Sequence, residues 1–394
     1  MPTSSRKSLF RTTAKQQSGM PSTPSTPRTP REPITAATTA AATTATPPRA
    51  RALLKQVIHV ADAIHTIRGR IATSTGAVPT VVAYPGYGST TWVRVLARVV
   101  LMRTSGTNTT GTVRGWRAFM SVPVRSSRVE VEVDGVTHLV QADAGGLVDV
   151  VLECSLTPGW HTITLRSADA KPAQTRVQIV DPDASFGIVS DIDDTVMVTA
   201  LPRPLLALWN TLVLSERART PTPGMAVMLD RVVAQNSGAP VLYLSTGAWN
   251  VAPALARFLA RNLYPDGVLL LTDWGPTRQH WFRSGPQHKL QNLARLAQEF
   301  PGVKWLLIGD DGQHDPAIYA EFSRAHPQQT AAIAIRQLSP SEALLAGGHA
   351  HAVGHAHAGS HAPDDPAFNH GEAPWVSAPD GAGLAEQLAA LGLL

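Results

Sequence analysis

The chain has 394 residues, a length that accommodates about two or three domains with a large buried core. Its hydrophobic fraction of 43% is typical of a soluble globular protein. We find neither a signal peptide nor an apolar stretch long enough to span a bilayer, so we expect a cytoplasmic protein. The single cysteine, Cys154, excludes an intrachain disulfide and is expected to be a buried packing residue.

The net charge of +5 is unevenly distributed along the chain. Residues 1–70 contain 11 Lys and Arg against 2 Asp and Glu, a net charge of +9, which leaves 23 basic and 27 acidic residues, net −4, in the remainder. A basic segment suits an anionic partner, and we interpret it as a peripheral contact with an anionic membrane. The alternative is a segment that only adds solubility, and nucleic acid is not an expected partner.

The first part of the chain is of low complexity. Residues 1–48 are rich in Thr, Pro and Ala and poor in large apolar residues, which predicts a disordered tail. In residues 49–72, aliphatic side chains recur at helical spacing between Arg and Lys, which predicts an amphipathic basic helix. We expect this helix to dock on the next domain, and the alternative is a helix lying in a membrane interface.

Residues 78–182 predict a small all-β, sandwich-like domain, because short apolar runs alternate with turn signals. Asp134-Gly135 between two Val-rich runs predicts a two-residue hairpin turn. The segment Tyr84–Gly88, rich in Gly and Tyr, is interpreted as a loop that forms either a contact surface or an ordinary turn. Nothing in this domain resembles a catalytic set.

Residues 184–340 alternate apolar strands with helical patterns, which predicts an α/β domain with a parallel sheet and right-handed crossovers. Ligands bind at the carboxyl ends of the strands in such sheets. The expected strands are Phe186–Ser190, Pro240–Ser245, Gly267–Leu271, Lys304–Gly309 and Ala331–Arg336. The expected helices between them are Gly224–Gln235, Val251–Leu263, His288–Phe300 and Asp315–His326.

The first of these strands runs directly into the acidic sequence Asp191-Ile192-Asp193-Asp194-Thr195. Three acids within four positions repel one another and cost desolvation, so a neutralising group is expected, and an oxygen-only ligand set favours magnesium. Residues two apart in an extended chain point the same way, which would let one of Asp191 and Asp193 bind metal and attack while the other handles protons. Thr195 would orient the second carboxylate or cap the next turn of the chain. The alternatives are a calcium-type loop or a simple acidic turn.

Other strand ends also carry polar residues. The second strand ends in Ser245-Thr246-Gly247, where a hydroxyl beside a flexible turn suits a phosphate oxygen, although Ser and Thr are also common caps at this point. The fourth ends in a second acidic cluster, Gly309–Asp315, where glycine allows close backbone approach. Lys289 lies at a helix start, where the helix dipole disfavours a cation, so it is expected to face anions.

This order of motifs, Asp-x-Asp-x-Thr, then Ser, then Lys, then Gly-Asp-x-x-x-x-Asp, resembles the haloacid dehalogenase-like phosphotransferase superfamily, which implies its Rossmannoid parallel sheet. Further runs are similar to the actin-patch-type phosphatidate phosphatase family, and the resemblance covers residues 78–340. These runs are Ile192–Thr195, Tyr243–Trp249, Leu271–Gly275, Gly309–Tyr319 and Tyr84–Gly88.

The resemblance implies a Mg²⁺-dependent phosphatase that hydrolyses phosphatidate to diacylglycerol and phosphate through an aspartyl-phosphate on Asp191. Asp193 would protonate the leaving group and then activate water, Ser245 would hold the phosphoryl group, and Lys289 would neutralise charge. The implied metal ligands are Asp191, Ile192 through its carbonyl, Asp193, Asp310 and Asp315. The expected substrate-binding residues are Thr195, Thr246, Gly247 and, in a loop where the superfamily places cap elements, Trp274, Arg278 and Arg283.

The sequence departs from the family pattern at Asp311, where the family usually has Ser. The added charge would either tighten metal binding or slow phosphate entry. Thr246-Gly247-Ala248 replaces a more polar turn of the family, so the resemblance does not determine the substrate preference of this chain. The alternative functions are a phosphatase of a soluble or nucleic-acid phosphomonoester, and a membrane-associated adaptor with little catalysis.

The end of the chain has two parts. Residues 347–372 contain six of the 14 histidines and are interpreted as a flexible His-rich linker with weak or no binding of transition metals. Residues 373–394 are expected to be a C-terminal helical tail, with a short helix over Leu384–Leu391 and with Pro374-Trp375 docking it on the body.

Overall fold

The structure is a computed structural model of the whole chain. It describes part of residues 67–74 and residues 76–103, 122–167, 171–198, 220–272, 285–345 and 371–394. The predicted disordered tail, most of the predicted basic helix and nearly all of the His-rich segment lie outside these ranges. None of the helices in the described ranges has the length and apolar character needed to cross a membrane.

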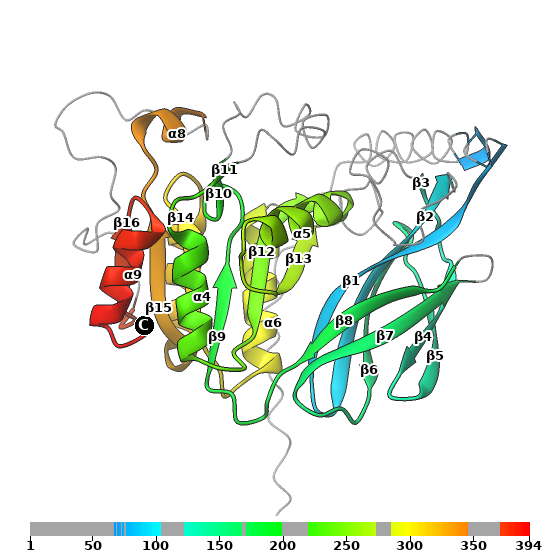
Figure 1. The fold of residues 1–394 in the computed structure, drawn as a ribbon, viewed down its shortest axis with the longest axis horizontal. Helices are drawn as coiled ribbons and strands as arrows, with labels where there is room; N and C mark the ends of the chain where they lie inside the picture. Colours follow the sequence, from blue (N-terminus) through cyan, green and yellow to red (C-terminus); the bar gives the residue numbers. More distant parts are fainter. Residues whose placement is uncertain are drawn as a thin grey trace, which may run out of the picture. The chain divides into compact units, whose positions relative to one another are not determined.

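Strands β1 to β8 form one eight-stranded sheet in the order β3-β2-β1-β8-β7-β4-β5, with β6 paired to β2 beside β3 (Figure 1). Neighbours are antiparallel except for the parallel pair β1 and β8. The strands are β1 Ala77–Ser89, β2 Trp92–Arg103, β3 Val122–Pro123, β4 Arg128–Val133, β5 Val136–Gln141, β6 Leu147–Glu153, β7 Gly159–Ser167 and β8 Ala173–Ile179. The β character expected here is therefore present, and the sandwich architecture stays a prediction.

Two local predictions in this sheet have different outcomes. The Asp134-Gly135 turn is confirmed: it joins β4 to β5, and both residues have positive φ, 51° and 72°, as a tight hairpin turn requires. The loop predicted at Tyr84–Gly88 is wrong, because these residues lie within β1. The pairing of β1 with β2 shifts register between Tyr84 and Tyr87, so Gly86 lies in a bulge of β1, where a Cβ would be 2.3 Å from the Arg94 carbonyl oxygen.

The second large sheet has six strands, all parallel, in the order β13-β12-β9-β14-β15-β16 (Figure 1). Its strands are β9 Phe186–Ser190, β12 Val241–Ala248, β13 Val268–Thr272, β14 Lys304–Asp310, β15 Thr330–Arg336 and β16 Trp375–Ala378. The parallel sheet and its first five strands agree with the sequence-based prediction. A separate two-stranded ribbon pairs β10 Met197–Val198 with β11 Thr220–Pro221.

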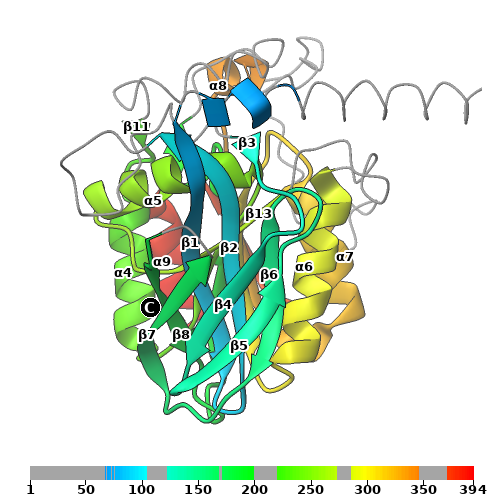
Figure 2. The ribbon, with the colours of Figure 1, turned by 90° about the vertical axis from the view of Figure 1, so that its right-hand side faces the viewer.

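Helices cover both faces of the parallel sheet. Helices α4, α5 and α9 lie on one face and α6 and α7 on the other (Figure 2). The helices are α4 Met225–Gln235, η3 Trp249–Val251, α5 Ala252–Arg261, α6 Gly285–Glu299, α7 Asp315–Ala325, η4 Pro327–Gln329, α8 Pro340–Leu345 and α9 Gly381–Ala390. With both faces covered, the central strands are apolar on both sides: Ile188 and Val189 of β9 are fully buried. Burial of each such side chain contributes about 1.5–3 kcal/mol to the stability of the folded protein, and this packing holds the strand ends in place.

The C-terminal segment belongs to the parallel sheet. The predicted terminal helix is confirmed as α9, and the carboxylate of Asp380 caps it by accepting the Gly383 N–H at 3.0 Å. The strand before it, β16, was not predicted, and it pairs with β15 along Ile333–Arg336. A Cβ on Gly381 would lie 2.3 Å from the Gly224 carbonyl carbon, so only glycine lets α9 begin against the start of α4.

Candidate active site

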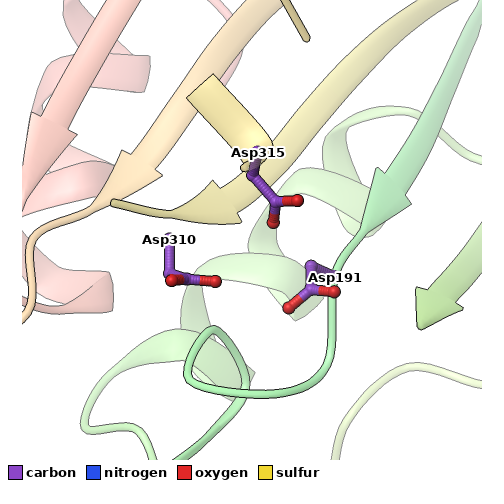
Figure 3. A group of neighbouring side chains, drawn as sticks. All are labelled: Asp191, Asp310 and Asp315. Carbon is purple, nitrogen blue, oxygen red and sulfur yellow. The ribbon is translucent and has the colours of Figure 1, made fainter. Parts of the chain in front are cut away.

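Three buried carboxylates meet at the carboxyl end of the parallel sheet (Figure 3). Asp191 follows β9, Asp310 ends β14, and Asp315 is the first residue of α7. One oxygen from each lies within 4.8 Å of the other two, and the residues are 3%, 0% and 1% exposed. The strand order therefore brings together side chains that are up to 124 positions apart (315 minus 191), as the motifs predicted.

Gly309 makes the approach of Asp315 possible. A Cβ at position 309 would lie 2.5 Å from the Asp315 Oδ2 and 2.8 Å from the Tyr319 ring. Asp315 also suits the first turn of α7, where its charge meets the positive end of the helix dipole and Pro316 needs no N–H partner. The strand-to-helix turn is thus built to place this carboxylate over the end of β14.

Lys289 joins two of the three carboxylates. Its Nζ lies 2.5 Å from the Asp191 Oδ1 and 2.5 Å from the Asp315 Oδ1, and its side chain is 7% exposed. Burial alone would lower the pKa of Lys289, but Asp191 and Asp315 raise it above its usual value, so the ammonium is charged. The prediction that this lysine faces anions is confirmed.

The same burial acts on the acids. Burial raises the pKa of Asp191 well above its usual value, against the lowering effect of Lys289, and Asp315 and Asp193 raise it further. Burial raises the pKa of Asp310 in the same way, and the neighbouring Asp315 and Asp191 add to it. One ammonium therefore does not compensate three carboxylates: with all three ionised, this buried cluster has a formal charge of −2.

Oxygen atoms are available for a cation. Asp310 Oδ2 and Asp315 Oδ2 are buried and, among the described residues, accept no hydrogen bond. Buried carboxylate oxygens without donors are costly unless a cation meets them. The donor set is all oxygen, which suits Mg²⁺ rather than a thiolate- or imidazole-binding metal. The residues present therefore fit the expected metal.

Asp191, the predicted nucleophile, is held at both carboxylate oxygens. Its Oδ1 accepts a hydrogen bond from the Lys289 ammonium, and its Oδ2 accepts the Thr195 Oγ1–H at 3.2 Å. Thr195 thus orients the first carboxylate of the pair, whereas the sequence analysis expected it to orient the second. Asp193 Oδ2 instead accepts the Ser245 Oγ–H at 3.0 Å, and Ser245 Oγ accepts the Gly247 N–H at 2.9 Å.

One predicted metal ligand has another role in the structure. The Ile192 carbonyl accepts the N–H groups of Val196 and Met197, at 3.0 and 3.1 Å. A carbonyl oxygen has two lone pairs, so both are already engaged by the turn that follows β9. The geometry does not support the Ile192 carbonyl as a magnesium ligand.

The remaining predicted residues are only partly placed. The Thr246 and Gly247 carbonyls accept the Thr272 Oγ1–H, at 2.9 and 3.1 Å, which ties the turn after β12 to the end of β13. The expected cap residues Trp274, Arg278 and Arg283 lie outside the described part of the chain. Asp311 Oδ1 accepts the Leu338 N–H at 2.8 Å, so this oxygen is bonded to the connection after β15.

Two residues of the site's surroundings were missed by the sequence analysis. Arg336, 4% exposed, donates its Nη1–H to the Asp194 carbonyl at 2.7 Å. Tyr84 of β1 stacks on Trp249, which follows the Ser245 turn, with ring centroids 4.8 Å apart. The position of Arg336, a charged residue at the end of an apolar strand, is a signal that could have identified it. The Tyr-rich segment that contains Tyr84 was noticed, but its partner Trp249 is 165 positions away in the sequence.

Comparison with known proteins gives a match over the first five strands of the parallel sheet. Residues 186–337 match the family described as the catalytic domain of phosphatidate phosphatase APP1. Phosphatidate phosphatase APP1 of Saccharomyces cerevisiae is 23% identical over 238 residues, 57% of this chain and 40% of that protein. The uncharacterized protein C29B5.04c of Schizosaccharomyces pombe is 26% identical over 169 residues, 43% of this chain and 27% of that protein. The chain thus spans less than half the length of either curated relative.

Similarity to solved structures is low. A carbohydrate acetylesterase from Xanthomonas citri covers 68% of this chain and 73% of its own, at 10% identity and a TM-score of 0.27.

Proposed function

We propose that this chain, whose residues 186–337 match the catalytic domain of phosphatidate phosphatase APP1, hydrolyses a phosphoric monoester. The observation that carries the proposal is the buried set of Asp191, Asp310, Asp315 and Lys289, which lies within the matched segment. Phosphatidate is the proposed substrate, because it is named for the matched family and for the yeast relative. We also propose that the parallel sheet is of the haloacid dehalogenase-like type, which the order of the motifs along the chain supports.

In the proposed reaction, the Asp191 carboxylate attacks phosphorus while the bond from phosphorus to the glycerol oxygen breaks. Asp193 gives its proton to that oxygen, which leaves as the hydroxyl of diacylglycerol. Asp193 then takes a proton from water, whose oxygen attacks the phosphorus of the aspartyl-phosphate while the bond from phosphorus to the Asp191 oxygen breaks, which releases phosphate and restores the Asp191 carboxylate. A carboxylate nucleophile divides one difficult displacement into two easier ones.

The contacts of the side chains support these roles. Lys289 and Thr195 hold the two oxygens of Asp191, which limits its rotation before attack. Ser245 holds Asp193 through its hydroxyl, and its proposed second role is to bind a phosphoryl oxygen of the substrate. Asp191, Asp310 and Asp315 would hold Mg²⁺, which when bound offsets negative charge on the transferring phosphoryl group.

The substrate is tested by phosphate release from phosphatidate in mixed micelles with Mg²⁺, beside free nucleotides and end-phosphorylated DNA. Release from phosphatidate at a kcat/KM at least about tenfold above the soluble esters supports the lipid assignment. Preference for a soluble ester would retain the chemistry and change the substrate. No release from any ester would overturn the proposed function.

Mg²⁺ is expected to raise the thermal unfolding midpoint relative to EDTA. A cation that binds only the folded protein stabilises it by about 2.7 kcal/mol at one hundred times its Kd. Asp310→Asn should abolish the shift, because it removes one buried charge and one ligand oxygen. Differential scanning calorimetry measures both.

Asp311→Asn is the matched control for this experiment. Asp311 is next to Asp310 in the sequence, and its own side chain accepts the Leu338 N–H. The amide oxygen of Asn can keep that hydrogen bond, so the Mg²⁺ shift should remain. A wild-type midpoint that is the same in Mg²⁺ and EDTA would contradict the metal assignment. A lost shift in Asp311→Asn would mean that the extra acid contributes to cation binding.

A further inference from the structure

A buried arginine joins the end of β15 to three other parts of the described chain. Arg336 pairs with Asp310 of β14 on one side and with Ala378 of β16 on the other. All three guanidinium nitrogens are engaged: Nη1 with the Asp194 carbonyl at 2.7 Å, Nη2 with Glu342 Oε1 at 2.7 Å, and Nε with the Pro379 carbonyl at 3.3 Å. Neither the proposed chemistry nor the family motifs use this residue.

The turn that Arg336 holds is the one that carries the catalytic candidates. Asp194 has a φ of 59°, in the left-handed region, which costs an L-residue roughly 1–2 kcal/mol. Within the turn, the Asp194 N–H bonds the Met197 carbonyl, and the Ile192 carbonyl accepts two N–H groups. The Asp194 carbonyl instead points out of the turn and meets the guanidinium. A charge-assisted hydrogen bond there offsets the cost of the strained conformation.

Asp194 lies between two residues of the site. Asp193 before it accepts the Ser245 hydroxyl, and Thr195 after it donates to Asp191. The Asp194 carbonyl belongs to the peptide group that leads into Thr195, so a rotation of this peptide would move the Thr195 hydroxyl away from Asp191. Displacements of about 1 Å in such a site cost about a hundredfold in rate.

We propose that Arg336 is a positioning residue for the catalytic turn, which fixes the directions of Asp193 and Thr195 without touching substrate. The proposal rests on the proposed phosphatase function. Glu342 and the Pro379 carbonyl hold the guanidinium in turn, and both lie after residue 337, outside the segment that matches the family. Residues beyond the matched domain thus contribute to its active-site geometry.

Hydrogen bonds to Ser339 orient the Glu342 carboxylate. Glu342 Oε2 accepts the Ser339 N–H at 2.9 Å, and Ser339 Oγ accepts the Glu342 N–H at 3.3 Å, which is the reciprocal pair of a capping box at the start of α8. Its other oxygen is left for Arg336. The capping box therefore orients the carboxylate toward the guanidinium.

The test compares Arg336→Met and Arg336→Lys with wild type. Arg336→Met should lower kcat for phosphate release by about a hundredfold and change KM by less than about threefold, because substrate contacts are unaffected. Arg336→Lys retains one charged donor and should restore part of kcat. Arg166→Met, which removes a half-exposed arginine paired with Glu132 in the other sheet, is the control and should match wild type.

Hydrogen exchange provides a readout that does not depend on activity. In Arg336→Met, the amides of Asp194, Val196 and Met197 should exchange about tenfold faster or more, while the amides of β9 keep their protection. Unchanged exchange in the turn would overturn the proposal. Faster exchange spread equally over β9, β14 and β15, with kcat lost in proportion to unfolding, would also overturn it, because Arg336 would then only stabilise the fold.

The two proposals can fail separately. If wild type releases phosphate from no ester, the phosphatase assignment fails, and the exchange rates still decide whether Arg336 holds the turn. If wild type is active and Arg336→Met has a wild-type kcat, only the positioning role fails. Should Arg336→Met not fold, Arg336→Lys is measured by the same two methods.

Discussion

Asp191→Asn should reduce phosphate release by at least about 10⁴-fold, because an amide is a poor nucleophile and a weaker metal ligand than a carboxylate. Asn has the same shape, and the Thr195 hydroxyl can still bond its oxygen, so the fold should remain. Acid quenching during turnover of radiolabelled phosphatidate measures the intermediate directly. Wild type should carry a hydroxylamine-labile phosphoryl group, and Asp191→Asn should carry none.

Asp230→Asn is the control for this change, since it alters an exposed acid on α4. Its turnover should equal that of wild type. The proposed mechanism fails if Asp191→Asn retains more than trace turnover with unchanged substrate preference. It also fails if wild type turns over rapidly while a phosphoryl group on Asp193, rather than Asp191, is the species trapped.

Lys289→Met should abolish activity and lower the free energy of unfolding in EDTA by about 3–5 kcal/mol, because it leaves buried carboxylates without their ammonium partner. In wild type the ammonium contacts both Asp191 and Asp315 at 2.5 Å. A bound cation would compensate part of the same charge, so the loss should be smaller in Mg²⁺. Urea unfolding under both conditions measures the difference.

Lys304→Met is the matched control, because Lys304 is an exposed lysine at the start of β14. It should change the unfolding free energy by less than about 0.5 kcal/mol under either condition. Wild-type stability of Lys289→Met in EDTA would mean that the cluster does not depend on the ammonium. An equal loss in EDTA and Mg²⁺ would mean that the cation and the lysine do not share the same carboxylates.

The positions of the acidic clusters were predictable because each follows from local sequence. Apolar runs such as Phe186–Ser190 define strands, parallel strands end at one edge, and polar residues at those ends must meet there. This reasoning placed Asp191, Asp310 and Asp315 together without any knowledge of strand order. It also predicted that Lys289 faces anions, although the helix begins at Gly285, four residues before this lysine, rather than at His288 as expected.

The contacts that could not be predicted join residues that are far apart in the sequence and belong to no recognisable sequence motif. Strand β16 has only four residues, and nothing local indicates that Trp375–Ala378 pairs with β15. Arg336 meets the Asp194 carbonyl 142 positions away, through a backbone atom that every residue has. The Ile192 carbonyl was assigned to metal from the resemblance alone, and its hydrogen bonds depend on a turn geometry that spacing does not specify.

Strand β16 also determines where the protein can be divided. A chain ended at residue 337 would keep every matched motif and leave β15 as an open edge, with the backbone groups that now pair with Trp375–Ala378 exposed. Open edges of this kind recruit other chains and aggregate. We therefore expect a stable version of this domain to include β16 and α9, which lie beyond the segment that similarity identifies.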